Sequence, residues 1–334
     1  MNRWIRLMEP SGVAEARRRA RRYASGLSMS STRVEHVAIV ATEIAQNVLR
    51  HGGGGQIMVE AFGPPGLEVL TIVGLDEGSG IERLDRMLKD GESTKNSSGT
   101  GFGAMLRLSD RLDIDTEPGK GTCVAAEFNT QPAPAGYAAD HAGFRLAYPG
   151  ERRSGDCVAV RRAGSRLIYM LSDALGHGPK AAEVAQEAET AFRASEGSDP
   201  ESILDQMNDA LSGSRGAVAA ILSVDVESRS LSYAAVGNIT TLMVHERKLK
   251  RLPVRDGLLG AGSRKPHVES FEVPEDAIFL MHSDGLSMLR SLDPYKSLLH
   301  RTAPVLAARL LDDLFRGRDD ASIIAVRMSQ AKAL

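Results

Sequence analysis

Four aspartates stand at the ends of expected strands, where a carboxylate commonly serves as a metal ligand. Asp173 follows the apolar run of residues 167–171 and precedes a glycine-rich turn. Asp156, Asp284 and Asp319 lie in the similar segments SGD, HSDG and RDDAS. A carboxylate at the mouth of a buried strand is costly unless a partner neutralises it. Four such groups would suit a hard divalent cation such as Mg²⁺ or Mn²⁺, and turn aspartates without a metal are the alternative.

A second candidate pair lies nearer the N-terminus. Residues 34–55 place apolar side chains at helical spacing before a run of glycines, which predicts an amphipathic helix. Glu43 and Asn47 are four residues apart on this helix, so their side chains lie one above the other. A carboxylate and a carboxamide placed in this way could act as a general base and a metal ligand. An exposed polar pair on the helix surface is the alternative.

Glycine-rich segments follow the next two expected strands. Asp76 comes directly after the strand of residues 67–75 and begins the segment DEGSG. Residues 98–103 read SGTGFG and precede a short expected helix at residues 104–109. Glycines let the backbone approach a ligand, and the free N–H groups at a helix N-terminus can bind phosphate. Each glycine cluster is a weak signal alone, and their order along the chain is more specific.

The elements that must position these residues form two groups. In the first half, strands are expected at residues 3–8, 56–62 and 67–75, and a helix at 13–27 with Ser11 as its N-cap. An Ala- and Pro-rich segment then predicts a linker at residues 131–142. In the second half, strands flank two helices at residues 179–195 and 200–212, which favours an α/β sandwich. Further strands are expected at 157–161, 218–226, 230–236, 240–245, 277–282 and 322–328, with a short helix after Asp284 and a helix at 304–315.

Composition narrows the function classes. The chain has 334 residues, 42% hydrophobic residues and a formal net charge of -2, which gives no overall attraction to nucleic acid or membranes. No run approaches a transmembrane span and the N-terminus lacks a signal-peptide core, so we expect a cytoplasmic protein. Cys123 and Cys157 fit neither a disulfide framework nor a zinc cluster. The arginines at residues 17–22 predict a solvated helix face, with docking of an acidic partner as the alternative.

The motifs of the first half, taken in order, resemble the N, G1 and G2 boxes of the GHKL ATPase family. Within that family, the segments EIAQNVLRHG and DEGSGI most resemble the RsbT-type serine/threonine switch kinases. The resemblance implies a GHKL (Bergerat) ATPase α/β sandwich over residues 1–130 that binds ATP and Mg²⁺. It implies Glu43 as general base, Asn47 as Mg²⁺ ligand and Asp76 as the residue that recognises the adenine amino group. An acceptor-only carboxylate is complementary to that amine.

The same resemblance assigns the remaining residues of the nucleotide site. Gly78 and Gly80 would shape the adenine pocket, and Thr122 would support the adenine. Gly99, Gly101 and Gly103 form the GTGFG box, with Gly101 and Gly103 near the phosphates. Anti-sigma factors that bind a partner without phosphorylating it share these boxes, so an ATP-dependent binding module remains the alternative to a kinase.

The aspartate motifs SGD, DALGHG, SDG and DDAS, in this order, resemble those of the PPM phosphatases, in particular the SpoIIE and RsbX branch. The resemblance implies an αββα sandwich over residues 143–329 that dephosphorylates phosphoserine or phosphothreonine. It implies two Mn²⁺ or Mg²⁺ ions, which together can activate a water for in-line attack on phosphorus. One ion would be held by Asp156 and Asp173, and the second by Asp173, the carbonyl of Ala174, Asp284 and Asp319.

Three further residues or segments of this half have more than one interpretation. His177 is expected to shape its turn, with a general acid as the alternative, and Asp320 is expected to cap or brace rather than bind metal. The segment AVGN at residues 235–238 replaces the AGH of many SpoIIE-type members and moves the resemblance towards RsbX.

Together these motifs predict an α+β protein of two domains, a switch kinase fused to an antagonistic phosphatase. The resemblance implies STAS-domain phosphoproteins of a stressosome or partner-switching module as partners, with an anti-sigma factor or another downstream regulator as a further candidate. A phosphatase with an ATP-binding module that sequesters a sigma factor is the second hypothesis. A non-catalytic scaffold is the third, and it is weakened because no metal or nucleotide motif is degraded.

Overall fold

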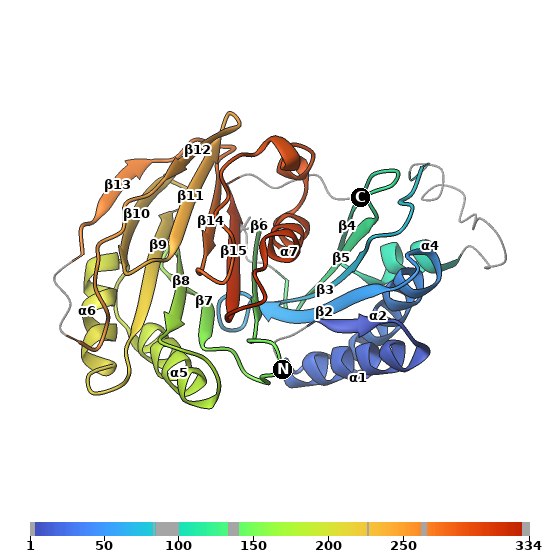
Figure 1. Cartoon of the computed structure of the whole chain (residues 1–334), viewed down its shortest axis with the longest axis horizontal. Coiled ribbons are helices and arrows are strands. Elements are labelled where there is room, and N and C mark those ends of the chain that lie inside the picture. Colours follow the sequence, from blue (N-terminus) through green and yellow to red (C-terminus); the bar gives the residue numbers. More distant parts are fainter. Residues whose placement is uncertain are drawn as a thin grey trace.

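Three five-stranded sheets, paired antiparallel throughout the described residues, organise the chain (Figure 1). The structure is a computed structural model and describes residues 4–82, 84, 100–132, 140–225, 227–261 and 266–328. With their helices, the sheets form the α+β fold of two domains that the sequence predicts. No helix in these ranges combines the length and apolar character that a membrane span requires.

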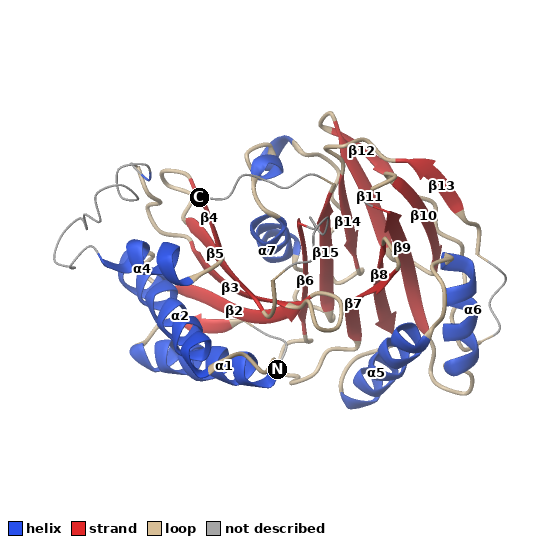
Figure 2. Ribbon diagram, turned by 180° about the vertical axis from the view of Figure 1, so that it is seen from behind, coloured by secondary structure: helices blue, strands red, loops and turns tan. Residues whose placement is uncertain are grey.

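Sheet A belongs to the N-terminal domain and has the strand order β1-β2-β3-β5-β4. Its strands are β1 (Ile5–Leu7), β2 (Gly55–Phe62), β3 (Val69–Asp76), β4 (Arg111–Thr116) and β5 (Thr122–Asn129). One face is covered by helices α1 (Pro10–Gly26), α2 (Ser31–His51) and α4 (Thr100–Leu108) (Figure 2). Alternation along β3 separates the two faces, because Leu70 and Ile72 join the core under the helices while Val73 and Leu75 face the other way.

Two sheets packed face to face form the C-terminal domain. Sheet B runs in the order β12 (Lys248–Arg251), β11 (Thr240–His245), β14 (Ile278–His282), β15 (Ala321–Arg327) and β6 (Asp140–Leu146). Sheet C runs in the order β13 (Glu269–Glu272), β10 (Ser230–Val236), β9 (Ala217–Asp225), β8 (Arg166–Ala174) and β7 (Asp156–Ala163). Helices α5 (Pro179–Ala194) and α6 (Pro200–Ala210) lie on the outer face of sheet C, and α7 (Ala303–Leu314) lies on the outer face of sheet B.

The buried strand β9 illustrates why this sandwich forms. Its side chains alternate between two apolar layers, as the period of a strand requires. Ala220, Leu222 and Val224 belong to the core between sheets B and C. Ala219 and Ile221 belong to the core beneath α5 and α6. A strand that is apolar on both faces therefore needs a sheet on one side and helices on the other.

Helix α7 packs against both domains. Its side chains are buried around most of its circumference, including Val305, Leu306, Leu310 and Leu311. A helix that is apolar on most sides must be covered on more than one. One side of α7 contacts β6 and β15, and another contacts β3, β4 and β5 of sheet A. Helix α7 therefore lies between sheets A and B, and one continuous apolar cluster joins the two domains (Figure 1).

Buried charged groups fix the position of α7. The carboxylate of Asp113 on β4 accepts a hydrogen bond from the backbone N–H of Thr302 at 2.8 Å. Asp140 on β6 accepts one from the N–H of Ala303 at 3.0 Å. Asp115 accepts one from the guanidinium of Arg309 at 3.2 Å. Carboxylates from outside the helix segment thus satisfy the free N–H groups at its start and complement its dipole.

Phe62, at the end of β2, extends the N-terminal domain into the core of the C-terminal domain. It is 7% exposed and belongs to the apolar cluster between sheets B and C. Its ring meets that of His141 edge-on, with centroids 5.3 Å apart, and stacks at 6.5 Å on Tyr169. Gly143 allows this approach, because a Cβ there would lie 2.5 Å from the ring of Phe62.

The structure corrects several expected elements. The short helix after Asp284 is absent from the described chain, which instead has two 3-10 helices, η1 (Asp293–Tyr295) and η2 (Leu298–His300). Ser11 is not the N-cap of α1, because the helix already starts at Pro10, whose ring fixes a helical φ. Residues 140–142 of the expected linker are the first residues of β6. The strands β4, β12 and β13 were not expected, because their runs are short or rich in charged residues.

Candidate functional site

The hairpin of β7 and β8 brings two of the predicted aspartates together. Asp156, the first residue of β7, is the direct cross-strand neighbour of Asp173 on β8. Residues directly opposite in an antiparallel pair point to the same face, with Cβ atoms about 5 Å apart. Asp156 is 0% exposed, and its Oδ1 has no hydrogen-bond partner within the described structure. Ala174, the last residue of β8, follows Asp173 directly.

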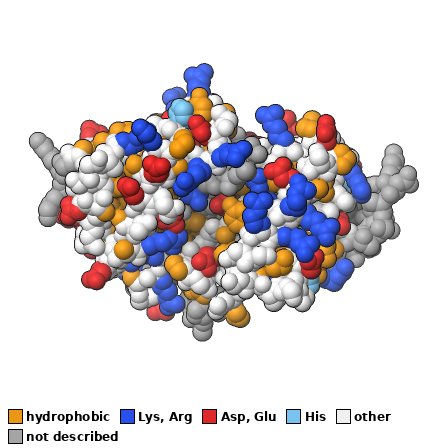
Figure 3. All heavy atoms as spheres, turned by 90° about the horizontal axis from the view of Figure 1, so that it is seen from below, with side chains coloured by type: hydrophobic (Ala, Val, Ile, Leu, Met, Phe, Trp, Pro, Cys, Tyr) orange, Lys and Arg blue, Asp and Glu red, His pale blue; other side chains and the backbone are white. Residues whose placement is uncertain are grey.

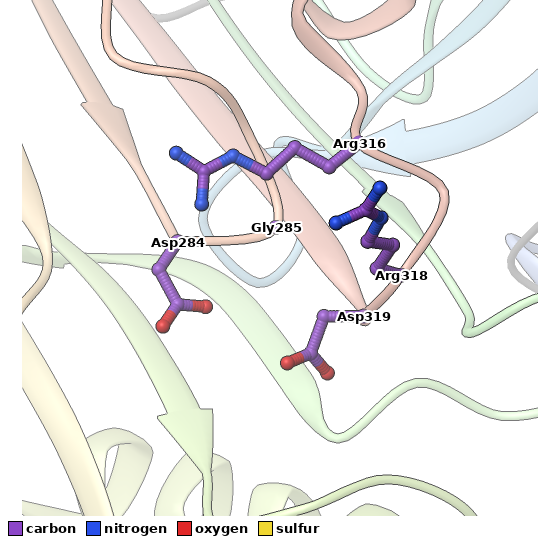
Figure 4. Close-up of a pocket in the computed structure, with 5 residues that line it drawn as sticks. All are labelled: Asp284, Gly285, Arg316, Arg318 and Asp319. Atoms are coloured by element: carbon purple, nitrogen blue, oxygen red, sulfur yellow. The ribbon is translucent and has the colours of Figure 1, made fainter.

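The other two aspartates lie in the loops next to β14 and β15. Asp284 follows β14, and Asp319 precedes β15, the neighbouring strand of sheet B. A pocket of about 450 Å³ is lined by both aspartates together with Gly285, Arg316 and Arg318. The two carboxylates point to the same side of this pocket (Figure 4). Adjacent strands thus deliver two carboxylates to one end of the sandwich.

Hydrogen bonds across the sandwich join the two pairs. The hydroxyl of Ser283, next to Asp284, donates to Oδ2 of Asp156 at 2.6 Å. The backbone N–H of Ser322 donates to the same hydroxyl at 3.0 Å. Asp320 accepts hydrogen bonds from the N–H groups of Tyr148 at 2.6 Å and Gly155 at 2.8 Å. Asp320 therefore braces the loops around the site, as the sequence predicts.

The electrostatics of this cluster favour a bound cation. Burial, followed by repulsion from Asp156 and Asp284, raises the pKa of Asp173 to about 10. Burial raises the pKa of Asp156 to about 7, although the hydrogen bond from Ser283 favours its charged form. Buried carboxylates with no cationic partner are costly, and a divalent cation on oxygen ligands removes that cost. The orphaned Oδ1 of Asp156 and the all-oxygen donor set fit Mg²⁺ or Mn²⁺.

The side chains do not, however, form a closed ligand cage. Within the described ranges, no three Asp, Glu, His or Cys side chains are close enough together to hold one ion. Asp156 and Asp173 come from β7 and β8, and Asp284 and Asp319 come from the loops next to β14 and β15. The assignment of Asp156, Asp173, Ala174, Asp284 and Asp319 as metal ligands remains a prediction.

Asn238 is a residue of this site that the sequence did not single out. Its Nδ2 donates a hydrogen bond to Oδ2 of Asp284 at 2.9 Å. Asn238 is the last residue of the AVGN segment, which in the sequence indicates only a departure from the family pattern. A carboxylate held by an amide keeps one oxygen directed at a ligand. His177 instead stacks on Tyr148, with ring centroids 4.0 Å apart, which supports its role in shaping the turn.

In the N-terminal domain, Asp76 is the best-fixed member of the predicted nucleotide site. Its Oδ1 accepts hydrogen bonds from the N–H of Gly78 at 2.9 Å and of Thr122 at 3.2 Å. Burial raises the pKa of Asp76, and these two hydrogen bonds act against that rise. Gly78 packs so tightly that a Cβ there would lie 2.7 Å from the Cα of Gly52. At Gly80, a Cβ would lie 2.2 Å from the carbonyl oxygen of Glu117. These turns hold Oδ1, whereas Oδ2 accepts no hydrogen bond from the residues that the structure describes.

Glu43 and Asn47 lie on α2 beside the start of α4. A Cβ on Gly101 would lie 2.8 Å from Oε2 of Glu43, so the glycine and the carboxylate are neighbours. Gly103, two residues further along α4, lies near the guanidinium of Arg107. Asn47 has a buried Nδ2 without a hydrogen-bond partner in the described part of the chain. Gly99 lies outside the described residues. A buried amide without a partner fits the edge of a ligand site.

The arginines of α1 lie on a different face of the molecule. Lys and Arg side chains gather on the half of the lower face that carries α1 (Figure 3). Arg17, Arg18 and Arg22 are exposed. Arg19 departs from the expected solvated face, because it is 5% exposed and pairs with Glu15 at 3.0 Å. The aliphatic part of the Arg19 side chain packs along the apolar stripe of α1, which explains its burial.

The fold and the carboxylate site together define a PPM-type phosphatase domain joined to a GHKL-type ATPase domain. Residues 163–329 match the family described as stage II sporulation protein E (SpoIIE), and residues 8–128 match the histidine kinase-like ATPase domain. Because the first match spans half of the chain, this protein belongs to the SpoIIE family and carries an additional ATPase domain. The SpoIIE match includes Asp173, Asp284 and Asp319 and begins after Asp156.

The two halves have different relatives. The serine/threonine-protein kinase RsbT of Bacillus subtilis is 29% identical over 122 residues, covering 36% of this chain and 92% of RsbT. The phosphoserine phosphatase RsbX of the same organism is 28% identical over 148 residues, covering 43% of this chain and 73% of RsbX. An anti-sigma F factor of Clostridium acetobutylicum is 29% identical over 106 residues, covering 30% of this chain and 73% of that protein. Both resemblances expected from the motifs are confirmed.

Two solved structures share the fold of the C-terminal half. One, from a study of the bacterial stressosome as a modular system that controls secondary messenger signalling, has a TM-score of 0.52 and 27% identity. It covers 57% of this chain and 99% of that chain. The other, RsbX in complex with magnesium, has a TM-score of 0.50 and 22% identity. It covers 59% of this chain and 98% of that chain, and it supports the fold alone.

Proposed function

We propose that this protein is a bifunctional regulator of a partner-switching module. Its N-terminal domain transfers phosphate from ATP to a serine or threonine of a protein partner, and its C-terminal domain removes phosphate from phosphoserine or phosphothreonine. The RsbT-like and RsbX-like halves support this pairing. The proposed partner is a STAS-domain phosphoprotein of a stressosome, and the stressosome structure that shares the fold supports that choice.

The carboxylate cluster carries the phosphatase half of the proposal. We assign Asp156 and Asp173 to one Mn²⁺ or Mg²⁺ ion, and Asp173, the carbonyl of Ala174, Asp284 and Asp319 to a second. When bound, two such ions supply an activated water and neutralise charge on the phosphoryl oxygens. Asp173 is suited to be the shared ligand, because it experiences repulsion from all the other carboxylates of the site. Ser283 and Asn238 hold Asp156 and Asp284 in fixed orientations.

The kinase half rests on two groups of residues, Asp76 with Gly78 and Thr122, and Glu43 with Gly101. Oδ2 of Asp76 would accept a hydrogen bond from the adenine amine. Thr122, whose backbone N–H donates to Oδ1 of Asp76, would support the adenine ring. Asn47 would hold Mg²⁺ through its carboxamide oxygen. Glu43, next to Gly101, would accept the proton of the attacking hydroxyl. Gly78, Gly80, Gly99 and Gly103 would line the nucleotide site. Catalysis would then depend mainly on positioning and charge neutralisation.

One alternative keeps the phosphatase and changes the first domain. The anti-sigma F relative favours an ATP-binding module that sequesters a sigma factor or activates a partner without phosphorylating it. The two readings differ in the role of Glu43. In a binding module, its loss would leave partner binding intact, and no phosphate would be transferred by either form.

A transfer assay tests the proposal. Host lysate is incubated with radiolabelled ATP, Mn²⁺ and Asp173→Asn protein, in which the proposed phosphatase site lacks its shared metal ligand. A labelled band that disappears with Asp173→Asn/Glu43→Ala, and not with Asp173→Asn/Glu35→Ala, supports the kinase. Glu35 is a matched control because it lies on the same helix and pairs with Arg21 at the surface. Removal of that label by wild-type protein supports the antagonistic phosphatase. Absence of any label, with ATP binding intact, favours the binding module.

A further inference from the structure

Two arginines beside the carboxylate pocket have no role in the metal site. Arg316 and Arg318 lie on the link between the end of α7 at Leu314 and the start of β15 at Ala321. Both side chains are exposed, and both line the 450 Å³ pocket with Asp284 and Asp319. Their presence at the mouth of an acidic site calls for an explanation in terms of charge.

The backbone around these arginines is held in place. The N–H of Arg316 donates to the carbonyl oxygen of Gly285 at 3.0 Å, and Phe315 forms a bridge with Leu286. The N–H of Ser287 donates to the carbonyl oxygen of Leu314 at 2.7 Å. Gly285 permits this close packing, because a Cβ there would lie 1.9 Å from the carbonyl oxygen of Asp320. The loop that carries Asp284 and the link that carries the arginines therefore form one unit.

The guanidinium groups have no ion pair among the residues that the structure describes, although two carboxylates line the same pocket. An arginine beside an accessible carboxylate normally forms a charge-assisted pair. In Figure 4 the guanidinium groups of Arg316 and Arg318 lie above Asp284 and Asp319, whereas both carboxylates point downward, away from them. The pocket thus keeps its anionic and cationic groups apart. Carboxylates suit cations, and a free guanidinium suits an anion with several oxygens.

We propose that Arg316, assisted by Arg318, binds the phosphoryl oxygens of the phosphatase substrate. This inference rests on the proposed phosphatase function and adds the residues that hold the substrate to it. A phosphate monoester bound at the carboxylate end of the pocket still presents oxygens that need donors. The planar guanidinium of Arg316 can supply two parallel N–H groups to such oxygens. Neither Arg316 nor Arg318 has an ion pair with another described residue that would have to break for its side chain to reach the substrate.

The test compares Arg316→Gln, Arg316→Lys and the Arg316→Gln/Arg318→Gln double variant with wild-type full-length protein in Mn²⁺. The substrate is para-nitrophenyl phosphate, which offers a phosphoryl group without any peptide. Arg316→Gln should raise KM roughly tenfold or more with a small change in kcat, since the lost hydrogen bonds serve binding. Arg316→Lys should recover part of this loss, and the double variant should exceed it. Arg290→Gln, an exposed arginine outside the pocket, is the control.

Two further readouts separate the possible failures. Calorimetric binding of inorganic phosphate should weaken in Arg316→Gln, whereas Mn²⁺ binding should stay the same. An unchanged KM and an unchanged phosphate affinity would overturn the role of Arg316. A loss confined to phosphoprotein substrate would also overturn it, because the arginine would then bind an acidic group of the partner. If wild-type protein hydrolyses nothing, the proposed function fails, and phosphate calorimetry still decides whether Arg316 binds the anion.

Discussion

Single side chains of the metal site differ in what they do for the carboxylates. Asp156 and Asp173 would donate oxygen atoms, whereas Asn238 and Ser283 fix the orientation of carboxylates by hydrogen bonds. An amide or hydroxyl of this kind lowers the cost of holding a ligand in one orientation. The proposed metal ligands and the residues that orient them are therefore different side chains, and each can be substituted separately.

Replacing Asn238 should weaken metal binding without unfolding the protein. Asn238→Ala removes the 2.9 Å hydrogen bond to Asp284, so the free carboxylate can rotate. We expect Mn²⁺ affinity to fall roughly tenfold to hundredfold, measured by calorimetric titration. Asn129→Ala, at an exposed position in the other domain, should leave that affinity unchanged. Equal Mn²⁺ affinities for Asn238→Ala and wild type would contradict an orienting role.

His141 and Glu127 should give opposite dependences of stability on pH. Burial lowers the pKa of His141 from 6.5 to about 4, so below pH 6.5 the unfolded chain binds a proton that the folded protein does not. The contribution of His141 is therefore present above pH 6.5 and is lost as the pH falls to 4, by up to about 3 kcal/mol. Burial raises the pKa of Glu127 from 4.5 to about 7, so its contribution is present below pH 4.5 and is lost as the pH rises to 7.

Urea unfolding at a series of pH values checks both signs. The free energy of unfolding of wild type minus that of His141→Gln should shrink as the pH falls from 6.5 to 4. The corresponding difference for Glu127→Gln should shrink as the pH rises from 4.5 to 7. Each variant serves as the control for the other. A difference that stays flat across its window would show that the group titrates alike in the folded and unfolded chain.

Among the elements, α7 has the most unusual position, because it belongs to the C-terminal domain and its N-terminus is capped by residues of both domains. Thr302, its N-cap, makes no side-chain hydrogen bond to the helix. Asp113 and Asp140 supply the missing acceptors from β4 and β6. The partner of Thr302 lies 189 residues away along the chain, so the helix start is stabilised only in the complete fold.

Removing this cap should destabilise both domains together. Asp113→Ala leaves the buried N–H of Thr302 without an acceptor and removes a partner of Arg301. We expect a loss of about 1–3 kcal/mol in the free energy of unfolding, measured in urea. Asp209→Asn, an exposed change on α6, should cost less than about 0.5 kcal/mol. If Asp113→Ala leaves the unfolding midpoint unchanged, the interdomain cap contributes nothing to stability.

At the scale of the whole molecule, the two domains share their core. One apolar cluster contains residues of sheet A, α7 and sheet B, and Phe62 adds a second anchor between sheets B and C. Domains joined by extensive apolar contact are expected to unfold as one unit. The shared core explains the order of the layers. They run from α1 and α2 through sheet A, α7, sheet B and sheet C to α5 and α6.

Calorimetry should show one unfolding transition for the whole chain. Phe62→Ala should lower the stability of that single transition by about 3–5 kcal/mol, because it leaves a cavity between sheets B and C. Met288→Ala, at a half-exposed methionine, should have little effect. Two separate transitions, of which Phe62→Ala shifts only one, would show that the domains are energetically independent.

The sequence by itself determined the two domain types, most helices and strands, and the identity of the candidate ligands. These are local properties, because periodicity sets which face of an element is apolar, and motifs place acids and glycines at the ends of strands. Asp76, Glu43 and the four aspartates were found in this way. The expected helix after Asp284 and the linker extending to residue 142 were wrong, because tertiary contacts override weak local preferences at such boundaries.

Only the tertiary structure decided how the parts meet. The two-sided burial of α7, the insertion of Phe62, the capping of α7 by Asp113 and the contact of Asn238 with Asp284 all join residues far apart in the chain. The periodicity of a helix shows that two faces are apolar, and it does not specify which sheets cover them. Arg316 and Arg318 likewise are ordinary surface residues in the sequence, and folding places them beside Asp284 and Asp319. Long-range packing decides these pairings, because the apolar face of one element could pack against the apolar face of several others.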